Sequence, residues 1–454
     1  MRKEWLLFIS SVLLYYFAPD YYSWPYCAVC CLVFIIGALC VVLPEIKRGV
    51  YLSFNIIFLF GYFWTSFAYP VLVYGSLADR DNLINKALNW DLLSHTSALA
   101  LLFIIAYILG FTYYGKKQNA KEGRIPRLRP PYLLYSMSLV AYLGVGIWGY
   151  IQTRSANMIV GQFLIDIYFV LFSICLFVNT NNSSSKYPHK LKYFFRINHF
   201  FIISGAFVFL TFIVLGDRMP AIKTILTIVA VYYLFWERIK VRHILSLGLL
   251  LLLLLFFVRQ TRGSDTNLAS GNVSRSTVEG VFSGENGPLF VFADLFFINR
   301  ELCLGYEYSQ THELYHPERI LIAPLSPIPL LPSTVSKLLW GIEPSKMETG
   351  ARLNDVLDSD FDIEGHLGNH PASDSLMSFG LIGMLLIAYL LGRSIGFIQK
   401  NIYSSFYMGV CYLVLMEWSL YLARATALTL IRPVGYVFLF GYLIYRIPIQ
   451  KKNK

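Results

Sequence analysis

The sequence predicts an all-α protein that crosses a membrane many times, on three observations. Of the 454 residues, 56% are hydrophobic and only 14% are charged, against about 25% charged in soluble domains. The mean hydropathy is +0.55. The apolar residues fall in blocks of about 20, the length that a helix needs to cross a hydrocarbon core of about 30 Å. Because no water satisfies backbone groups there, such blocks must be helical, and a soluble two-domain protein is excluded.

Twelve apolar segments are candidate membrane spans. Nine of them lie in residues 1–258 and three in residues 375–454. The stretch from 259 to 374 has no convincing span, so we expect one large loop there, outside the membrane. The candidates are residues 5–18, 26–44, 50–74, 94–114, 131–151, 159–179, 197–215, 220–236, 244–258, 375–393, 403–422 and 433–446.

The positions of lysine and arginine predict which side of the membrane each loop faces. With the N-terminus inside, most basic residues fall in loops on the cytoplasmic face, such as 116–129 and 186–196. Few fall in the short loops opposite, which is the positive-inside pattern. This pattern explains the formal charge of +11, so no nucleic-acid partner is expected. Both termini are predicted to be cytoplasmic.

The large loop carries more than half of the acidic residues of the chain. Its run Ala323-Pro-Leu-Ser-Pro-Ile-Pro-Leu-Leu-Pro332 cannot form a continuous helix, because proline lacks the backbone donor. We expect an irregular strip on the membrane surface. The preceding stretch 289–304 is apolar with charges interspersed, which predicts an interfacial helix. An outer segment of this length is typical of a functional region.

The sequence Gly216-Asp-Arg-Met-Pro220 opens the eighth span on the outer face. Proline suits the first turn of a helix, so this helix would point free N–H groups outward beside Arg218, with Lys223 one turn deeper. Helix starts with basic side chains bind phosphates, and a lysine inside a span marks a functional candidate. In the alternative interpretation, Arg218 pairs with Asp217 and Lys223 extends to the interface.

Four further arginines are candidates for the same phosphate site. Arg259 and Arg262 follow the ninth span at the outer surface, and Arg424 and Arg432 flank the last outer loop. If they face Arg218, they supply a second basic group for a diphosphate. If they do not, they are ordinary interfacial arginines.

The segment from Gly365 to Asp374 joins the large loop to the tenth span. It places His366, His370 and Asp374 at the membrane surface, directly before a helix. A histidine there could accept a proton from a substrate hydroxyl, because its pKa lies near neutrality. The alternative is a helix cap at Ser373 or Asp374 with solvated histidines. Two histidines four residues apart also fit a metal site, but no matching ligands occur elsewhere, so no metal is expected.

In its overall plan the chain resembles the O-antigen and capsule repeat-unit polymerases, the Wzy family, and more distantly the O-antigen ligases. The resemblance covers the twelve spans, the Gly-x-Arg element at 216–218, a basic position after the next span, and the large outer loop. It extends to the Pro-rich strip, to Met347-Glu-Thr-Gly350, and to Asn369-His370 followed by Phe379-Gly-Leu-Ile-Gly383. The ligase pattern His-x-His-Asn is not reproduced, since here Asn369 precedes His370.

The resemblance implies a membrane-embedded glycosyltransferase of the C type in a bacterial cytoplasmic membrane, with its active site outside. Such an enzyme joins undecaprenyl-diphosphate-linked repeat units into O-antigen or capsular polysaccharide, and no cofactor is expected. The implied partners are the lipid-linked glycan donor and acceptor, the lipid bilayer, a chain-length regulator and a flippase. Three other functions stay open. They are an O-antigen ligase, a flippase of the lipid-linked unit, and a C-type transferase that uses lipid-phosphate monosaccharides, for which Asp20 would be the acidic candidate.

The resemblance also implies roles for individual residues. Arg218 would contact the donor phosphates, and Arg259 or Arg262 would be a second contact. His370 would be the general base, and His366 and Asp374 remain alternatives for that role.

Overall fold

The chain folds into helices in every part that the structure, a computed structural model, describes with secondary structure. These helices belong to two compact units that do not follow chain order. Unit 1 comprises Met1–Ala120, Phe292–Lys400 and Ser419–Arg432, and unit 2 comprises Lys121–Val291, Asn401–Trp418 and Pro433–Lys454. The boundaries predicted at 258 and 374 are of a different kind, because they separate the expected membrane spans from the expected outer loop. The described residues are 2–73, 89–115, 127–153, 159–184, 191–214, 218–235, 248, 298–361 and 368–446.

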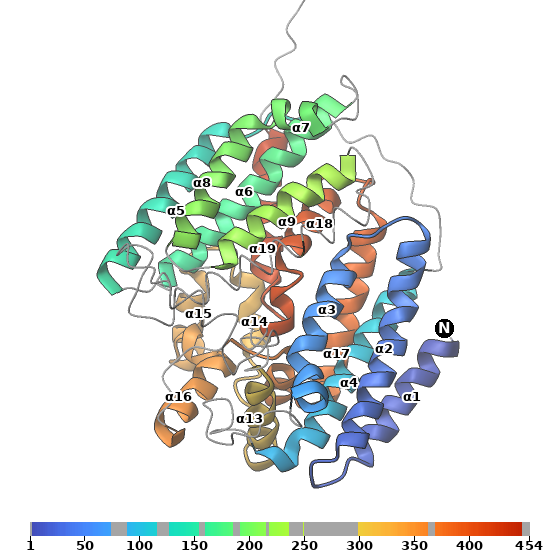
Figure 1. The fold of residues 1–454 in the computed structure, drawn as a ribbon. Helices are drawn as coiled ribbons and strands as arrows, with labels where there is room; N and C mark the ends of the chain where they lie inside the picture. The colour runs from blue at the N-terminus through green and yellow to red at the C-terminus, as the bar shows by residue number, and fades with distance from the viewer. Residues whose placement is uncertain are drawn as a thin grey trace, which may run out of the picture. The chain divides into compact units, whose positions relative to one another are not determined.

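Four long helices pack together in unit 1 (Figure 1). They are α1 (Arg2–Tyr16), α2 (Trp24–Lys47), α4 (Leu93–Gly115) and α17 (Pro371–Lys400), with α4 in contact with the other three. A shorter helix, α3 (Phe54–Ser66), starts at Ser53, whose side chain accepts a hydrogen bond from the N–H of Ile56. A side-chain cap of this kind satisfies one of the free donors of a helix start. A π-helical turn follows at Tyr69–Val73, and a 3-10 turn at Trp90–Leu92 precedes α4.

The helices α4 and α17 meet backbone to backbone. A Cβ on Gly110 of α4 would lie 2.0 Å from the carbonyl oxygen of Tyr389, and a Cβ on Gly392 of α17 would lie 2.0 Å from that of Tyr107. Glycine at both positions permits this approach, as small residues do between helices in membranes.

α17 is two helical segments rather than one. Gly380 has φ 66° and ψ −178°, which is not helical, and it separates residues 371–379 from residues 381–400. The first segment is buried in unit 1 up to Ser378, whereas Ile382 after the break is 84% exposed. The predicted span 375–393 lies within the candidate span Pro371–Lys400 and includes this break, and its limits stay a prediction.

The described part of the large loop is helical as well. It contains α13 (Ile298–Thr311), α14 (Arg319–Ile322), α15 (Leu331–Trp340) and α16 (Thr349–Phe361). Residues 298–306 of α13 are buried, so the interfacial helix predicted for 289–304 is wrong over its described part. The neighbours of α13 in unit 1, which include α17 and α16, cover it. Residues 289–297 lie outside the described residues.

The Pro-rich run is irregular, as its composition predicts. A 3-10 turn at Ala323–Leu325 is followed by turns up to α15, and a second 3-10 turn stands at Pro344–Met347. Apolar side chains point outward here, and Leu330 and Leu338 are 79% and 81% exposed. Exposed apolar groups of this kind fit the predicted strip on a membrane surface, which stays a prediction.

Unit 2 is a second helical bundle (Figure 1). Its core is rich in stacked aromatic rings, such as Tyr142 against Phe212 with centroids 4.7 Å apart. Aromatic pairs in this arrangement add to the stabilisation from buried apolar area. Its helices are α5 (Tyr132–Thr153), α6 (Ile159–Ser184), α7 (Leu191–Ile197), α8 (His199–Val214), α9 (Arg218–Phe235), α18 (Phe406–Trp418) and most of α19 (Ile431–Arg446).

Four described helical segments are long and apolar enough to cross a membrane. The bent pair α7 and α8, with 85° between them, would be a fifth, and five shorter apolar helices accompany them. The all-helical, membrane-compatible class is thus confirmed for the described residues, and the count of twelve spans stays a prediction. The segments are Trp24–Lys47, Trp90–Tyr113, Phe163–Ser183 and Pro371–Lys400.

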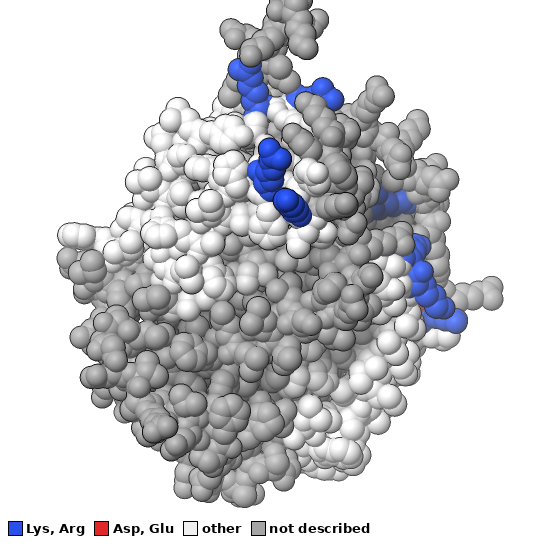
Figure 2. Space-filling view, turned by 45° about the horizontal axis from the view of Figure 1, so that its top comes forward, with Lys and Arg blue, Asp and Glu red and all other residues white. Residues whose placement is uncertain are grey.

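Figure 2 shows a small number of lysine and arginine side chains on one face, some of them beside one another, among uncharged described residues. Of the loops predicted to be cytoplasmic, the described basic residues Lys47, Arg48, Arg127 and Arg129 are exposed. Residues 116–126 and 185–190 lie outside the described residues, so the charge asymmetry of the loops stays a prediction.

Candidate functional site

His370 is the N-cap residue of α17. Its ring Nδ1 accepts a hydrogen bond from the backbone N–H of Ala372 at 3.2 Å, and its carbonyl accepts one from the N–H of Asp374 at 2.9 Å. Pro371 follows as the first helical residue, where its missing N–H is not needed. A cap is present, as the alternative interpretation expected, but His370 provides it in place of Ser373 or Asp374. The ring is buried and not solvated.

Both nitrogens of the His370 ring are engaged. Since Nδ1 accepts a hydrogen bond, the neutral ring carries its proton on Nε2, which lies 2.9 Å from Ser66 Oγ. Burial lowers the pKa of His370 to about 3, so the ring is neutral at physiological pH. The predicted role as general base therefore requires the hydrogen bond from Ala372 to Nδ1 to open, because Nε2 already carries a proton.

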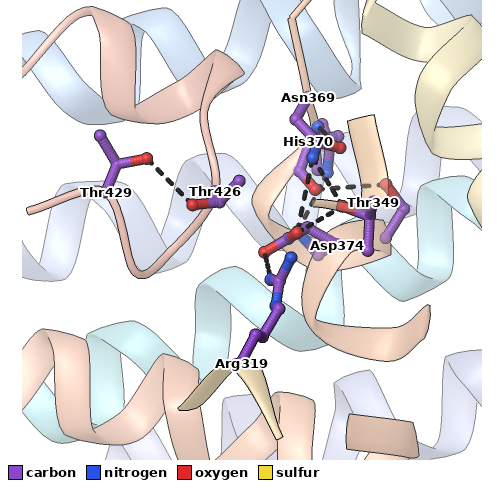
Figure 3. A network of polar contacts seen from close by, with 9 residues as sticks. Arg319, Thr349, Asn369, His370, Asp374, Thr426 and Thr429 are labelled. Atoms are coloured by element: carbon purple, nitrogen blue, oxygen red, sulfur yellow. Dashed lines mark hydrogen bonds and ion pairs between the residues drawn. The ribbon is translucent and has the colours of Figure 1, made fainter. Parts of the chain in front are cut away.

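Asp374 lies one turn into α17 at the centre of a buried polar network (Figure 3). Its Oδ2 is 2.5 Å from Arg319 Nη2, and its Oδ1 accepts a hydrogen bond from Thr349 Oγ1 at 2.5 Å. Asn369 Nδ2 donates to Thr349 Oγ1 at 2.7 Å. These four residues, from α14, α16 and the start of α17, are the Asp374 network.

Arg424 adjoins this network through its backbone. It ends a 3-10 turn at Tyr421–Arg424, and its carbonyl accepts a hydrogen bond from the N–H of Asn369 at 3.2 Å. Gly368 has a φ of +97°, and a Cβ there would lie 3.0 Å from the same carbonyl oxygen. The close approach therefore depends on glycine, which also tolerates this backbone conformation.

Glu348 links the Asp374 network to a further arginine. The charges of Arg319, Asp374 and Arg432 all act on its carboxyl group, so these groups lie within electrostatic range of it. Arginines paired with carboxylates in this way present a planar fork of donors, which suits phosphate groups. Of the predicted site residues, the structure brings together in unit 1 His370, Asp374, Arg424 and Arg432.

Lys223 lies in the core of unit 2, where its side chain is fully buried. Its Nζ is 3.9 Å from Asp166 Oδ1 on α6 and 3.6 Å from the centre of the Trp418 ring on α18. Next to Trp418, Glu417 accepts a hydrogen bond from Thr227 at 3.0 Å. A buried ammonium whose charge is balanced by a carboxylate is not open to a diphosphate in this conformation. In this structure the Lys223 side chain is buried beside Asp166, and its predicted role at a phosphate site stays a prediction.

Replacing Lys223 by methionine is expected to destabilise the protein by about 3–5 kcal/mol, because Asp166 would be left as a buried charge without its cation. Adding Asp166→Asn should recover most of that loss. The midpoint of thermal unfolding of the detergent-solubilised protein checks both. Lys192→Met, at an exposed lysine of α7, is the matched control and should have little effect. Equal midpoints for the wild type and Lys223→Met would contradict the assignment.

Four predicted site residues lie wholly or partly outside the described part of the chain. Arg218 is the first residue of α9, but its side chain is not described. Arg259, Arg262 and His366 are not among the described residues. Their roles stay predictions.

Sequence reasoning missed three residues that contact the predicted ones. Thr349 stands in Met347-Glu-Thr-Gly350, a pattern that the resemblance singled out without a role. Ser66 is a hydroxyl inside an apolar segment, and this contrast is the signal that could have found it. Arg319 lies among other charged residues of the large loop, where nothing in the sequence distinguishes it.

Comparisons of the chain with known protein families, with curated proteins and with solved structures found no match.

Proposed function

We propose that the protein is a membrane glycosyltransferase that joins undecaprenyl-diphosphate-linked repeat units on the outer face of a bacterial cytoplasmic membrane. The observation that carries the proposal is the Asp374 network, a buried set of arginine, carboxylate, hydroxyl and amide groups placed directly before the apolar segment 381–400. A substrate that is half lipid and half glycan needs such a junction, with polar groups for sugar and phosphate beside a surface that lipid can reach.

The proposed chemistry needs positive charge where the leaving group departs. The hydroxyl at the non-reducing end of one repeat unit attacks the anomeric carbon of the lipid-linked chain, and the bond from that carbon to the diphosphate breaks. The diphosphate keeps the electron pair, so arginine side chains stabilise charge that grows in the transition state. Arg424 and Arg432, which adjoin the Asp374 network, are suited to this role, and Arg218 is a further candidate from its sequence context.

The glycan profile of a deletion strain tests the proposed function. Without the gene, single lipid-linked repeats should remain and the surface polysaccharide ladder should be lost, and the wild-type gene should restore the ladder. Arg218→Ala is expected to lower the rate of polymer formation about 100-fold at normal membrane levels, whereas Arg48→Ala, at an exposed arginine, should not.

Other outcomes would replace the proposal with its alternatives. Long lipid-linked chains that accumulate in the deletion strain would indicate a ligase. Single repeats that accumulate only on the cytoplasmic face would indicate a flippase. An unchanged ladder would overturn all three functions.

A further inference from the structure

The first turn of α13 buries three consecutive polar residues. Asn299, Arg300 and Glu301 are at most 1% exposed. Among the described residues, neither carboxyl oxygen of Glu301 has a hydrogen-bond partner, and Asn299 Nδ2 has none either. Buried polar groups without partners are rare in native proteins, and each needs a reason such as a bound molecule or a catalytic role.

Two close approaches, one on each side of Glu301 along the helix, bring α13 against the start of α17. The side chain of Ile298 lies 3.4 Å from the position of a Cβ on Gly368, and a Cβ on Gly305 would lie 2.7 Å from the Cβ of Ser373. Glu301 stands one turn from Ile298 and one turn from Gly305 along the same helix. This register brings it level with His370, and all of these residues belong to unit 1.

The other candidate bases of this region are already engaged. His370 uses Nδ1 for the N–H of Ala372 and Nε2 for Ser66. Asp374 is held by Thr349 through one oxygen and by Arg319 through the other. Glu301, by contrast, is buried with neither carboxyl oxygen hydrogen-bonded among the described residues.

The electrostatic setting of Glu301 suits proton transfer near neutral pH. Burial raises the pKa of Glu301 to about 7, and the neighbouring charge of Arg300 opposes that increase only in part. A general base works best when its pKa lies near the working pH, because it is then ionised without being too weak to take the proton.

We propose that Glu301 is the catalytic residue that removes the proton from the attacking sugar hydroxyl, with Asn299 donating a hydrogen bond to the oxygen of that hydroxyl. This rests on the proposed function. The O–H proton passes to a carboxylate oxygen of Glu301 as the oxygen forms its bond to the anomeric carbon. The bond from that carbon to the diphosphate breaks, and the undecaprenyl diphosphate leaves with the electron pair. His370 then acts as a positioning residue that caps α17.

The test compares three variants of the full chain with the wild type. The assay uses membranes from the deletion strain that carry each variant, supplied with the lipid-linked single repeat extracted from that strain. Glu301→Gln keeps the shape of the protonated acid, so it should fold. Glu307→Gln is the matched control, an exposed glutamate on the same helix. His370→Asn keeps a capping side chain.

Glu301→Gln is expected to lower the rate of polymer formation at least 100-fold at a normal membrane level. Glu307→Gln should match the wild type, and His370→Asn should retain most of its activity. The wild-type rate should rise about tenfold per pH unit below about 7, and the residual rate of Glu301→Gln should not.

Two results would overturn the role of Glu301, and they are distinguishable from a failure of the proposed function. If the wild type polymerises and Glu301→Gln does so equally, Glu301 is not the base and the function stands. If Glu301→Gln stays active while His370→Asn is inactive, the base is His370. If the wild type itself forms no polymer from the extracted repeat, the proposed function fails and the catalytic role falls with it.

Discussion

Gly392→Ala is expected to destabilise the protein by more than about 3 kcal/mol, although it adds only one methyl group. That methyl carbon would lie 2.0 Å from the carbonyl oxygen of Tyr107, which is backbone and cannot rotate away. The helices α4 and α17 would have to separate along their contact. Ordinary overpacking costs about 1–3 kcal/mol, and a clash with backbone at this distance exceeds it. Gly110→Ala should behave alike, because it meets the carbonyl of Tyr389 at the same distance.

The same substitution elsewhere supplies the control. A Cβ on Gly144 of α5 would meet nothing within 4 Å. Gly144→Ala should therefore leave stability unchanged or raise it by about 0.5–1 kcal/mol, since alanine favours the helix. The midpoint of thermal unfolding in detergent measures each variant. Equal midpoints for Gly392→Ala and Gly144→Ala would refute the backbone contact between α4 and α17.

Asp374→Ala is expected to lose about 3–5 kcal/mol of stability and all polymer formation. Arg319 is 7% exposed, and without Asp374 its charge would be buried and unpaired. The hydroxyl of Thr349 would also lose its acceptor. The loss of polymer follows because the Asp374 network fixes the start of α17, against which α13 with Glu301 packs.

A double variant separates stability from activity. Arg319→Met combined with Asp374→Asn removes both charges, so most of the lost stability should return. Polymer formation should stay absent, because the arginine fork and the carboxylate that fix the network are gone. Thermal unfolding and the glycan profile measure the two effects. If the double variant forms polymer again, the Asp374 network has a structural role only. If Asp374→Ala is as stable as the wild type, the ion pair between Arg319 and Asp374 does not stabilise the protein.

The helical class could be predicted from the sequence because it depends on composition and on the lengths of apolar blocks. A helix start close after His370 could also be predicted, but the predicted cap was Ser373 or Asp374 and not His370 itself. The partners of these residues could not be predicted, because they lie far away along the chain. Ser66 is 304 residues from His370, and nothing local to the large loop indicates that Arg319 pairs with Asp374.

Buried charges were the least predictable feature of the candidate site. Lys223 follows a helix start and resembles an anion contact until Asp166, on another helix, is placed beside it. Glu301 sits in an apolar stretch with scattered charges, a pattern that also describes a helix lying on a membrane. Which face of such a helix is covered depends on its neighbours, and a single sequence does not contain that information.

The break at Gly380 leaves a helical segment whose length is close to the thickness of a hydrocarbon core. Residues 381–400 form about 20 residues of helix, or about 30 Å at 1.5 Å per residue, the depth of a hydrocarbon core. An unbroken helix from Pro371 would measure about 45 Å and would have to tilt or thicken the bilayer around it. If residues 381–400 cross a bilayer, Gly380 lies at one end of that span. His370 and Asp374, on the buried segment before the glycine, would then keep a fixed distance from the end of the span.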